Sequence, residues 1–318
     1  MKVSDRVEKG MGNDMEERFQ MKTAVAMIIF NRPDTTKEVF DAIRQAKPPR
    51  LYIISDAPRK GREEEKKKVA ETRSYVEEHV DWECEVIKNY AEANMGCKKR
   101  VASGITWLFE HEEAAIILED DCVPKQEFFR YTQEMLEKYK DDRSVYMVSG
   151  TNDLPDYEIK GDYAFSHFAS IWGWATWRRA WSEHYDINME RWPEVRAGKS
   201  LRSLFGNPLQ YKLFVRDADK IHAGLVDTWD LQWVFTILYN HGVGITPRGN
   251  LIHNIGCGRE DATHTKDNSR EVSEYGEFSF PITFKEKVEV DREYEKHYTK
   301  KFYGFKRIMN ALKQKIFH

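Results

Sequence analysis

The sequence predicts an α/β fold in which a mostly parallel central sheet is flanked by helices. From residue 21 onward, short apolar runs of strand length alternate with longer amphipathic stretches, which is typical of a parallel sheet covered by helices. Polar residues follow directly after three of these apolar runs. With 41% hydrophobic and 32% charged residues in 318, the composition is that of a globular protein with a sizeable core.

The regular part of this pattern lies before about residue 150. Strands are expected at 24–30, 51–54, 84–87, 114–118 and 145–148. The helix through Val39 and Ile43 is expected to begin at the capping-box spacing of Thr35 and Glu38. The next helices are expected over 63–79, over 101–109 and along the apolar stripe from Phe128 to Leu136.

After about residue 150 the alternation stops, and the chain becomes rich in tryptophan and loops. Trp174, Trp177 and Trp181 stand at helical spacing, which predicts a buried stripe with Trp177 and Trp181 in the core. We expect this half to form the other wall of a cleft rather than an independent domain. The predicted organisation is a flexible tail (1–20), one domain (21–290, with halves 21–150 and 151–290) and a basic amphipathic helix (291–318).

Charge and cysteine content exclude several classes of protein. A net charge of −3 argues against a general nucleic-acid binder, and four scattered cysteines suggest neither a zinc ribbon nor a disulfide framework. No apolar run approaches the ~20 residues that span a bilayer, and residues 1–20 lack the apolar core of a secretory leader, so a cytoplasmic location is expected. Residues 296–318 carry seven Lys or Arg and no acid. We expect this segment either to lie on an anionic membrane surface, at the inner face of the membrane, or to dock on the body of the protein.

The residues best suited to bind a ligand or to catalyse a reaction follow three of the predicted strands. These residues are Asn31 and Arg32, Ser55 and Asp56, and Glu119, Asp120 and Asp121. The carboxyl ends of parallel strands meet at one edge of a sheet, so we expect these side chains to share a crevice. Three consecutive carboxylates repel one another unless a cation neutralises them, and hard oxygen ligands favour Mn²⁺ or Mg²⁺. A solvated acidic turn is the alternative. The usual Gly-rich phosphate loops are missing from the sequence.

The acidic triplet, within Ile117-Leu118-Glu119-Asp120-Asp121-Cys122-Val123-Pro124, resembles the E-D-D region of the N-acetylglucosaminyltransferase I family. Further similar segments occur in the same order at Phe30-Asn31-Arg32-Pro33, Ile54-Ser55-Asp56, Phe128-Phe129, Val148 to Asp153, Gly173-Trp174 and Trp229-Asp230. The resemblance extends from about residue 24 to about residue 258. It implies a bacterial-type glycosyltransferase with a GT-A-like fold.

The resemblance also implies roles for the residues at the strand ends. Asp121 would bind the Mn²⁺ or Mg²⁺ that holds the diphosphate of the donor, with Glu119 and Asp120 on the nucleotide side. Arg32 and Asp56 would contact the nucleoside, and we place the adjacent Asn31 and Ser55 in the same nucleotide-sugar site. Without the resemblance, Arg32 and Asp56 would be interpreted as an ion pair between loops.

The catalytic base of the family is an acid in a W-D-D-W segment, and this chain departs from that pattern. It has Asp227-Thr228-Trp229-Asp230-Leu231-Gln232-Trp233, so the second acid of the pair is absent. Asp230 is the first candidate for the base and Asp227 the alternative. Either acid is also a candidate cap for the helix that follows. His253 is a further candidate metal or phosphate ligand, although a lone His is more often structural.

The matching family segment places Trp172, Gly173 and Trp174 on the acceptor side. The resulting hypothesis is a metal-dependent transfer of a hexosyl or N-acetylhexosaminyl group, with inversion, from a nucleotide-diphosphate sugar to a hydroxyl of a glycan or lipid-linked glycan. Such a reaction serves cell-surface polysaccharide or lipopolysaccharide synthesis. One alternative is a sugar-nucleotide pyrophosphorylase, which the absence of a Gly-rich loop after the first strand disfavours. The other is a catalytically silent glycan-binding protein that uses the tryptophans.

Overall fold

The central sheet contains strands from both halves of the chain. The computed structural model describes residues 19–259 and 274–304, and its eight-stranded sheet has the order β3-β2-β1-β4-β8-β6-β9-β7. The strands are β1 (Ala24–Ile29), β2 (Arg50–Ser55), β3 (Glu85–Tyr90), β4 (Ala114–Glu119), β6 (Val145–Ser149), β7 (Tyr163–Ser166), β8 (Trp174–Trp177) and β9 (Val243–Pro247). Only β7 and β8 run against the others within this sheet of the described residues. The predicted α/β fold with a mostly parallel sheet is therefore confirmed.

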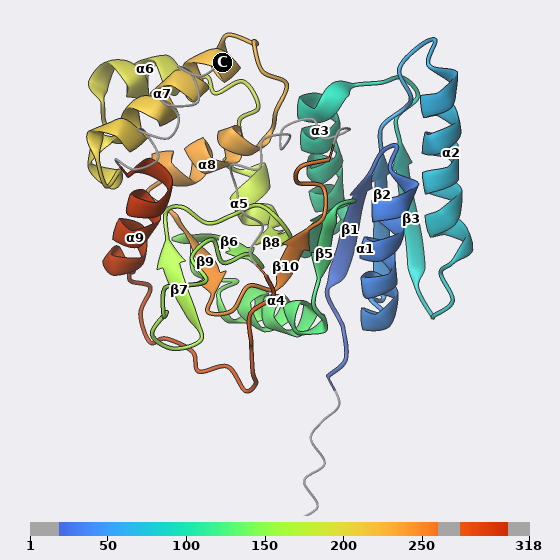
Figure 1. The fold of residues 1–318 in the computed structure, drawn as a ribbon, viewed down its shortest axis with the longest axis horizontal. Coiled ribbons are helices and arrows are strands. Elements are labelled where there is room, and N and C mark those ends of the chain that lie inside the picture. Colours follow the sequence, from blue (N-terminus) through green and yellow to red (C-terminus); the bar gives the residue numbers. More distant parts are fainter. Residues whose placement is uncertain (1–18, 260–273, 305–318) are drawn as a thin grey trace, which may run out of the picture.

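Helices cover both faces of the sheet (Figure 1). They are α1 (Pro33–Ala46), α2 (Glu63–Glu78), α3 (Gly96–His111), α4 (Gln126–Lys138), α5 (Arg178–Ser182), α6 (Trp192–Gly198), α7 (Pro208–His222), α8 (Asp230–Tyr239) and α9 (Arg292–Tyr303). One apolar cluster joins α1, α2 and α4 to one face, and a second joins α3, α5 and α8 to the other. All six residues of β1 are buried, because both faces of this strand are covered.

The chain reverses its direction of winding beside β1. It passes from β1 to β2 and β3 through α1 and α2, and then returns through α3 to place β4 on the other side of β1. Ile28 of β1 lies opposite Glu119 of β4. The carboxyl ends of β1 and β4 therefore border the switch point, where open α/β sheets bind their ligands.

A small second sheet lies at the same end of the molecule. It pairs β5 (Cys122–Pro124) with β10 (Ile252–Asn254) in antiparallel register, with His253 opposite Val123. Because β5 follows the acidic triplet directly, this pairing brings residues near 253 to the end of β4.

The second half of the chain completes the sheet instead of forming a separate layer. The predicted helical stripe of tryptophans is wrong, because Trp174 and Trp177 belong to β8, which pairs with β4 and β6. Trp177 and Trp181 are buried, as predicted. Helices α6 to α9 pack around a third apolar cluster, at the left of Figure 1 and away from α1 and α2.

Two helices begin earlier than the sequence predicts. Helix α1 starts at Pro33 instead of the predicted capping box, because proline needs no N–H donor and its fixed φ suits the first helical turn. Thr35 uses its hydroxyl on the carbonyl of Arg32. Helix α3 starts at Gly96, before the predicted 101, because its first turn receives acceptors from elsewhere in the fold.

The C-terminal helix α9 packs on the body of the protein. Tyr294, Glu295 and Tyr298 are buried, and Glu295 accepts hydrogen bonds from the backbone N and ring Nδ1 of His167, both at 2.8 Å. Residues 305–318 of the predicted basic helix and residues 1–18 of the predicted tail lie outside the described residues. Within residues 19–259 and 274–304, no helix has the length and apolar character needed to cross a membrane.

Candidate functional site

The acidic triplet lies at the carboxyl end of β4, beside the end of β1. Glu119 is the last residue of β4, and Asp120 and Asp121 form the turn into β5. Ligand atoms of Glu119, Asp121 and Cys122 lie within 4.8 Å of one another, which is close enough to share one metal ion. Sequence analysis missed Cys122, although its place directly after Asp121 was a usable signal.

The loop after β10 closes on Asp121. The backbone N of Ile255 donates to the carbonyl of Asp121 at 2.9 Å. At Gly256 an added Cβ would stand 2.0 Å from Oδ2 of Asp121, so only glycine fits this close approach. The backbone thus forms a cradle around the carboxylate.

Arg32 places a positive charge beside this carboxylate. Its Nη1 lies 2.9 Å from Oδ2 of Asp121 and 3.8 Å from Oδ1 of Asp120. The other oxygen of Asp120 accepts a hydrogen bond from the backbone N of Phe30 at 3.2 Å. The alternative of an ion pair between Arg32 and Asp56 is therefore wrong, because the guanidinium turns across the switch point to β4 instead.

The cluster remains electrostatically unbalanced despite Arg32. Burial, reinforced by the charges of Asp121 and Asp120, raises the pKa of Glu119 to about 8. Burial and the charge of Asp121 raise the pKa of Asp120 to about 7, although the Arg32 guanidinium opposes this shift. Carboxylates in this condition bind either protons or a cation near neutral pH.

Asp56 and Ser55 lie at the carboxyl end of β2, where Asp56 is buried. The Asp56 carboxylate accepts hydrogen bonds from the side chain of Asn94 at 3.0 Å and from the backbone N of Met95 and Gly96 at 2.9 and 3.0 Å. The hydroxyl of Ser55 accepts a hydrogen bond from Nε of Arg73. Asp56 therefore holds the start of α3 as well as bordering the crevice.

A second carboxylate completes the cap of α3. Asp227 accepts hydrogen bonds from the backbone N of Cys97 at 2.9 Å and of Lys98 at 3.0 Å. Two acids from distant parts of the chain thus satisfy the amides of the first helical turn. The predicted capping role of Asp227 belongs to α3 and not to the helix that follows it in sequence.

Asp230 has a different environment, as the first residue of α8. Its Oδ1 accepts hydrogen bonds from the backbone N of Leu231 at 2.7 Å and from the hydroxyl of Thr228. Its Oδ2 has no hydrogen bond to any residue that the structure describes. The charge of Asp230 contributes to the raised pKa of Glu119, and the neighbouring Trp229 opposes that shift. Asp230 therefore lies within electrostatic reach of Glu119, and its Oδ2 accepts no hydrogen bond from the described residues.

The remaining predicted residues lie around this centre without joining it. Trp174 is 1% exposed and stacks on Trp229 with ring centroids 5.7 Å apart. Trp172 is also buried, and at Gly173 an added Cβ would stand 2.3 Å from the side chain of Ile252. These side chains support the site from the interior instead of lining an open surface.

His253 and Asn31 also stand apart from the metal-competent group. The ring of His253 lies 5.7 Å from that of Tyr275, and among the described residues that group consists of Glu119, Asp121 and Cys122. The side chain of Asn31 donates to Glu65 at 3.4 Å. Both residues remain at the same end of the sheet.

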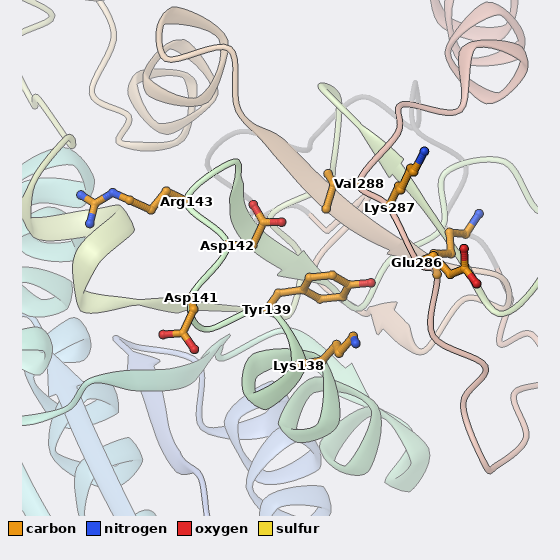
Figure 2. Close-up of a pocket in the computed structure, with 9 residues that line it drawn as sticks. Lys138, Tyr139, Asp141, Asp142, Arg143, Glu286, Lys287 and Val288 are labelled. Atoms are coloured by element: carbon orange, nitrogen blue, oxygen red, sulfur yellow. The ribbon is translucent and has the colours of Figure 1, made fainter.

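A pocket of about 590 Å³ lies elsewhere, between the end of α4 and residues 285–288 (Figure 2). Tyr139 stands at its centre, and charges of both signs surround it, including Lys138, Asp141 and Arg143. It borders the amino end of β6, which runs parallel to β4, so it lies at the sheet edge opposite the acidic cluster. None of the predicted site residues lines it.

Comparison with known proteins finds no matching family model and no matching curated protein. Several solved structures are distantly similar. Mannose-1-phosphate geranyltransferase from Thermus thermophilus is 12% identical, with a TM-score of 0.37 over 71% of this chain and 73% of that one. The glycosyltransferase GlyE of Streptococcus pneumoniae is 8% identical, with a TM-score of 0.34 over 69% and 43%. Mouse xyloside xylosyltransferase 1 is 10% identical, with a TM-score of 0.32 over 69% and 83%. At these values the likeness assigns no activity to this chain.

Proposed function

We propose that this protein is a metal-dependent glycosyltransferase that uses a nucleotide-diphosphate sugar. The observation that carries the proposal is the meeting of Arg32, the acidic triplet and Asp230 at the switch point between β1 and β4. A cation, a phosphate-binding guanidinium and a carboxylate base are the groups that transfer from a diphosphate leaving group needs.

Glu119 and Asp121 would hold the divalent cation, with Asp120 behind them. Burial and the charge of Asp121 raise the pKa of the Cys122 thiol and so disfavour its thiolate, and the carboxylates are the proposed ligands. Hard oxygen ligands suit Mn²⁺ or Mg²⁺. Such a cation would neutralise charge on the leaving diphosphate. His253 is outside the group of side chains close enough to share an ion among the described residues, so it is not among the proposed ligands.

Asp230 is the proposed catalytic base. Both oxygens of Asp227 accept backbone N–H groups of α3, whereas Oδ2 of Asp230 makes no hydrogen bond within the described residues. A carboxylate with a free oxygen can take the proton of an acceptor hydroxyl as that hydroxyl attacks the anomeric carbon. One base and a single displacement give inversion at that carbon.

The two halves of the domain would divide the substrates between them. Residues 21–150 would hold the nucleotide sugar through Asn31, Arg32 and the loop after β2, in which Asp56 fixes the start of α3. Residues 151–290 would provide the acceptor side, with Trp172 and Trp174 as its buried support. The acceptor would be a glycan or lipid-linked glycan used in polysaccharide or lipopolysaccharide synthesis. Basic residues of the C-terminal segment that do not pack on the body would then bring the enzyme to the inner membrane surface.

Calorimetric titration of nucleoside diphosphates and their sugars, with and without Mn²⁺, tests the proposal. Asp121→Ala should abolish Mn²⁺-dependent nucleotide binding. Asp230→Asn should keep that binding but lower turnover by about 10²- to 10⁴-fold, the usual contribution of a general base. Asp141→Asn, in the remote pocket, is the matched control and should change neither. Nucleotide binding by Asp121→Ala that still responds to Mn²⁺ would refute the assignment.

A further inference from the structure

Both side chains of the ion pair between Arg32 and Asp121 are largely shielded from solvent. The exposed fractions of the two side chains are both 14%, and that of the Asp120 side chain is 12%. The same carboxylate oxygen, Oδ2 of Asp121, faces the backbone of Gly256. The guanidinium is therefore packed into the acidic cluster rather than lying on its surface.

This pairing conflicts with the binding of a divalent cation. Asp121 belongs to the three residues whose ligand atoms are close enough to share a metal ion. A cation at that position would compete with Nη1 for the carboxylate and would repel the guanidinium, since two positive charges a few ångströms apart repel strongly where water is limited. Displacing the guanidinium alone would break its 2.9 Å ion pair with Asp121 in a partly buried site, which is unfavourable.

A diphosphate would remove that penalty. Phosphate oxygens accept the planar, forked donors of arginine in pairs, so a displaced Arg32 would exchange one anionic partner for another. The metal and the diphosphate would then each make the binding of the other more favourable, by the same factor.

We propose that Arg32 is an internal counter-ion of Asp121, which a divalent cation and a diphosphate displace together, so that the two ligands bind cooperatively. This inference rests on the proposed function. It assigns to Arg32 a coupling role at the metal-binding carboxylate, beyond contact with the nucleoside.

The start of helix α1 is held by the main chain of Arg32 and not by its side chain. Its carbonyl accepts a hydrogen bond from the backbone N of Thr36 at 3.0 Å, and Pro33 starts α1 with its own fixed φ. Helix α1 is thus anchored by main-chain groups, and a change of the Arg32 side chain should leave the helix in place.

The test compares Mn²⁺ binding to the wild-type protein and to Arg32→Met at pH 8. Occupancy is followed by quenching of tryptophan fluorescence, because Trp229 is a neighbour of Glu119, and is checked by calorimetry. We expect Arg32→Met to bind Mn²⁺ alone more tightly than the wild type. In the wild type, a saturating nucleoside diphosphate (UDP, GDP, CDP and ADP in turn) should tighten Mn²⁺ binding by about 5- to 150-fold, the usual range for coupled sites. Most of that tightening should be lost in Arg32→Met.

Arg44→Met is the matched control, because Arg44, near the end of α1, pairs with Asp81 away from the triplet and from the loop after β2. It should bind Mn²⁺ as the wild type does, with the same response to the nucleotide. Arg32→Lys keeps the charge without the fork and should show intermediate coupling. Circular dichroism and thermal unfolding establish that each variant is folded.

Two outcomes overturn the inference. If Arg32→Met binds Mn²⁺ alone no more tightly than the wild type, the guanidinium does not compete with the cation. If the nucleotide tightens Mn²⁺ binding equally in both proteins, Arg32 does not couple the ligands. Failure of the proposed function has a different signature: the wild type and Asp121→Ala would bind Mn²⁺ equally.

Discussion

Replacing Asp227 by alanine separates a positioning role for this acid from a catalytic one. The carboxylate accepts two backbone N–H groups in the first turn of α3, from Cys97 and Lys98. Loss of such a cap costs about 0.5–2 kcal/mol, and loss of a negative charge at a helix N-terminus costs about 0.3–1 kcal/mol. Because Asp227 is exposed and water can replace it, we expect a total near the lower end, about 1 kcal/mol.

For a chain of 318 residues, about 1 kcal/mol corresponds to a fall in Tm of roughly 1–2 °C. Thermal unfolding followed by circular dichroism measures this fall. Asp217, which pairs with its neighbour Arg216 on α7, is the matched control, and Asp217→Ala should shift Tm by less. Turnover of Asp227→Ala should fall only in part, and its dependence on pH should follow that of the wild type, because Asp230 remains to take the proton.

The reasoning fails if Asp227→Ala has an unchanged Tm and no measurable turnover at any pH. That combination would identify Asp227 as the base and Asp230 as the supporting acid. A lower Tm combined with retained turnover is the result that the geometry predicts.

Three further outcomes are expected. Because the pKa of Glu119 is raised in the folded protein, its contribution to stability is present at low pH and is lost as the pH rises through about 8. Without added cation, the Tm should therefore fall as the pH rises toward about 8. Calorimetry in buffers of different ionisation enthalpy should also detect protons released when Mn²⁺ binds. Binding without proton release would contradict the raised pKa of Glu119. Gly256→Ala should weaken Mn²⁺ binding with little loss of secondary structure, since its Cβ would stand 2.0 Å from Oδ2 of Asp121, and unchanged affinity would show that the loop moves aside. Glu295→Ala should lower the free energy of unfolding in urea by about 1–3 kcal/mol, because the buried backbone N–H of His167 loses its acceptor, while Glu295→Gln should cost less; equal losses in the two variants would mean that packing of α9 dominates.

The sequence by itself determined the sheet and the place of the acidic triplet. The apolar run of residues 114–118 is a local pattern, and the residues that follow a strand in sequence lie at its end in space. The parallel arrangement of the predicted strands placed Arg32 and Asp121 in one crevice. The sequence did not predict that strands β1 and β4 are direct neighbours in the sheet. Sequence periodicity reports on neighbours along the chain, and the strands and the acids that follow them depend mainly on such neighbours.

Tertiary structure alone decided which distant residues satisfy one another. Helix α3 starts at Gly96 because Asp56 and Asp227 accept its first amides, and nothing near residue 96 in sequence indicates this. Trp174 belongs to a strand because β4 and β6 offer it backbone partners on both sides, which overrides helical spacing. Asp230 differs from Asp227 for the same reason. The two acids are chemically alike and three positions apart, but both oxygens of Asp227 accept amides of α3, whereas Oδ2 of Asp230 accepts no hydrogen bond within the described residues.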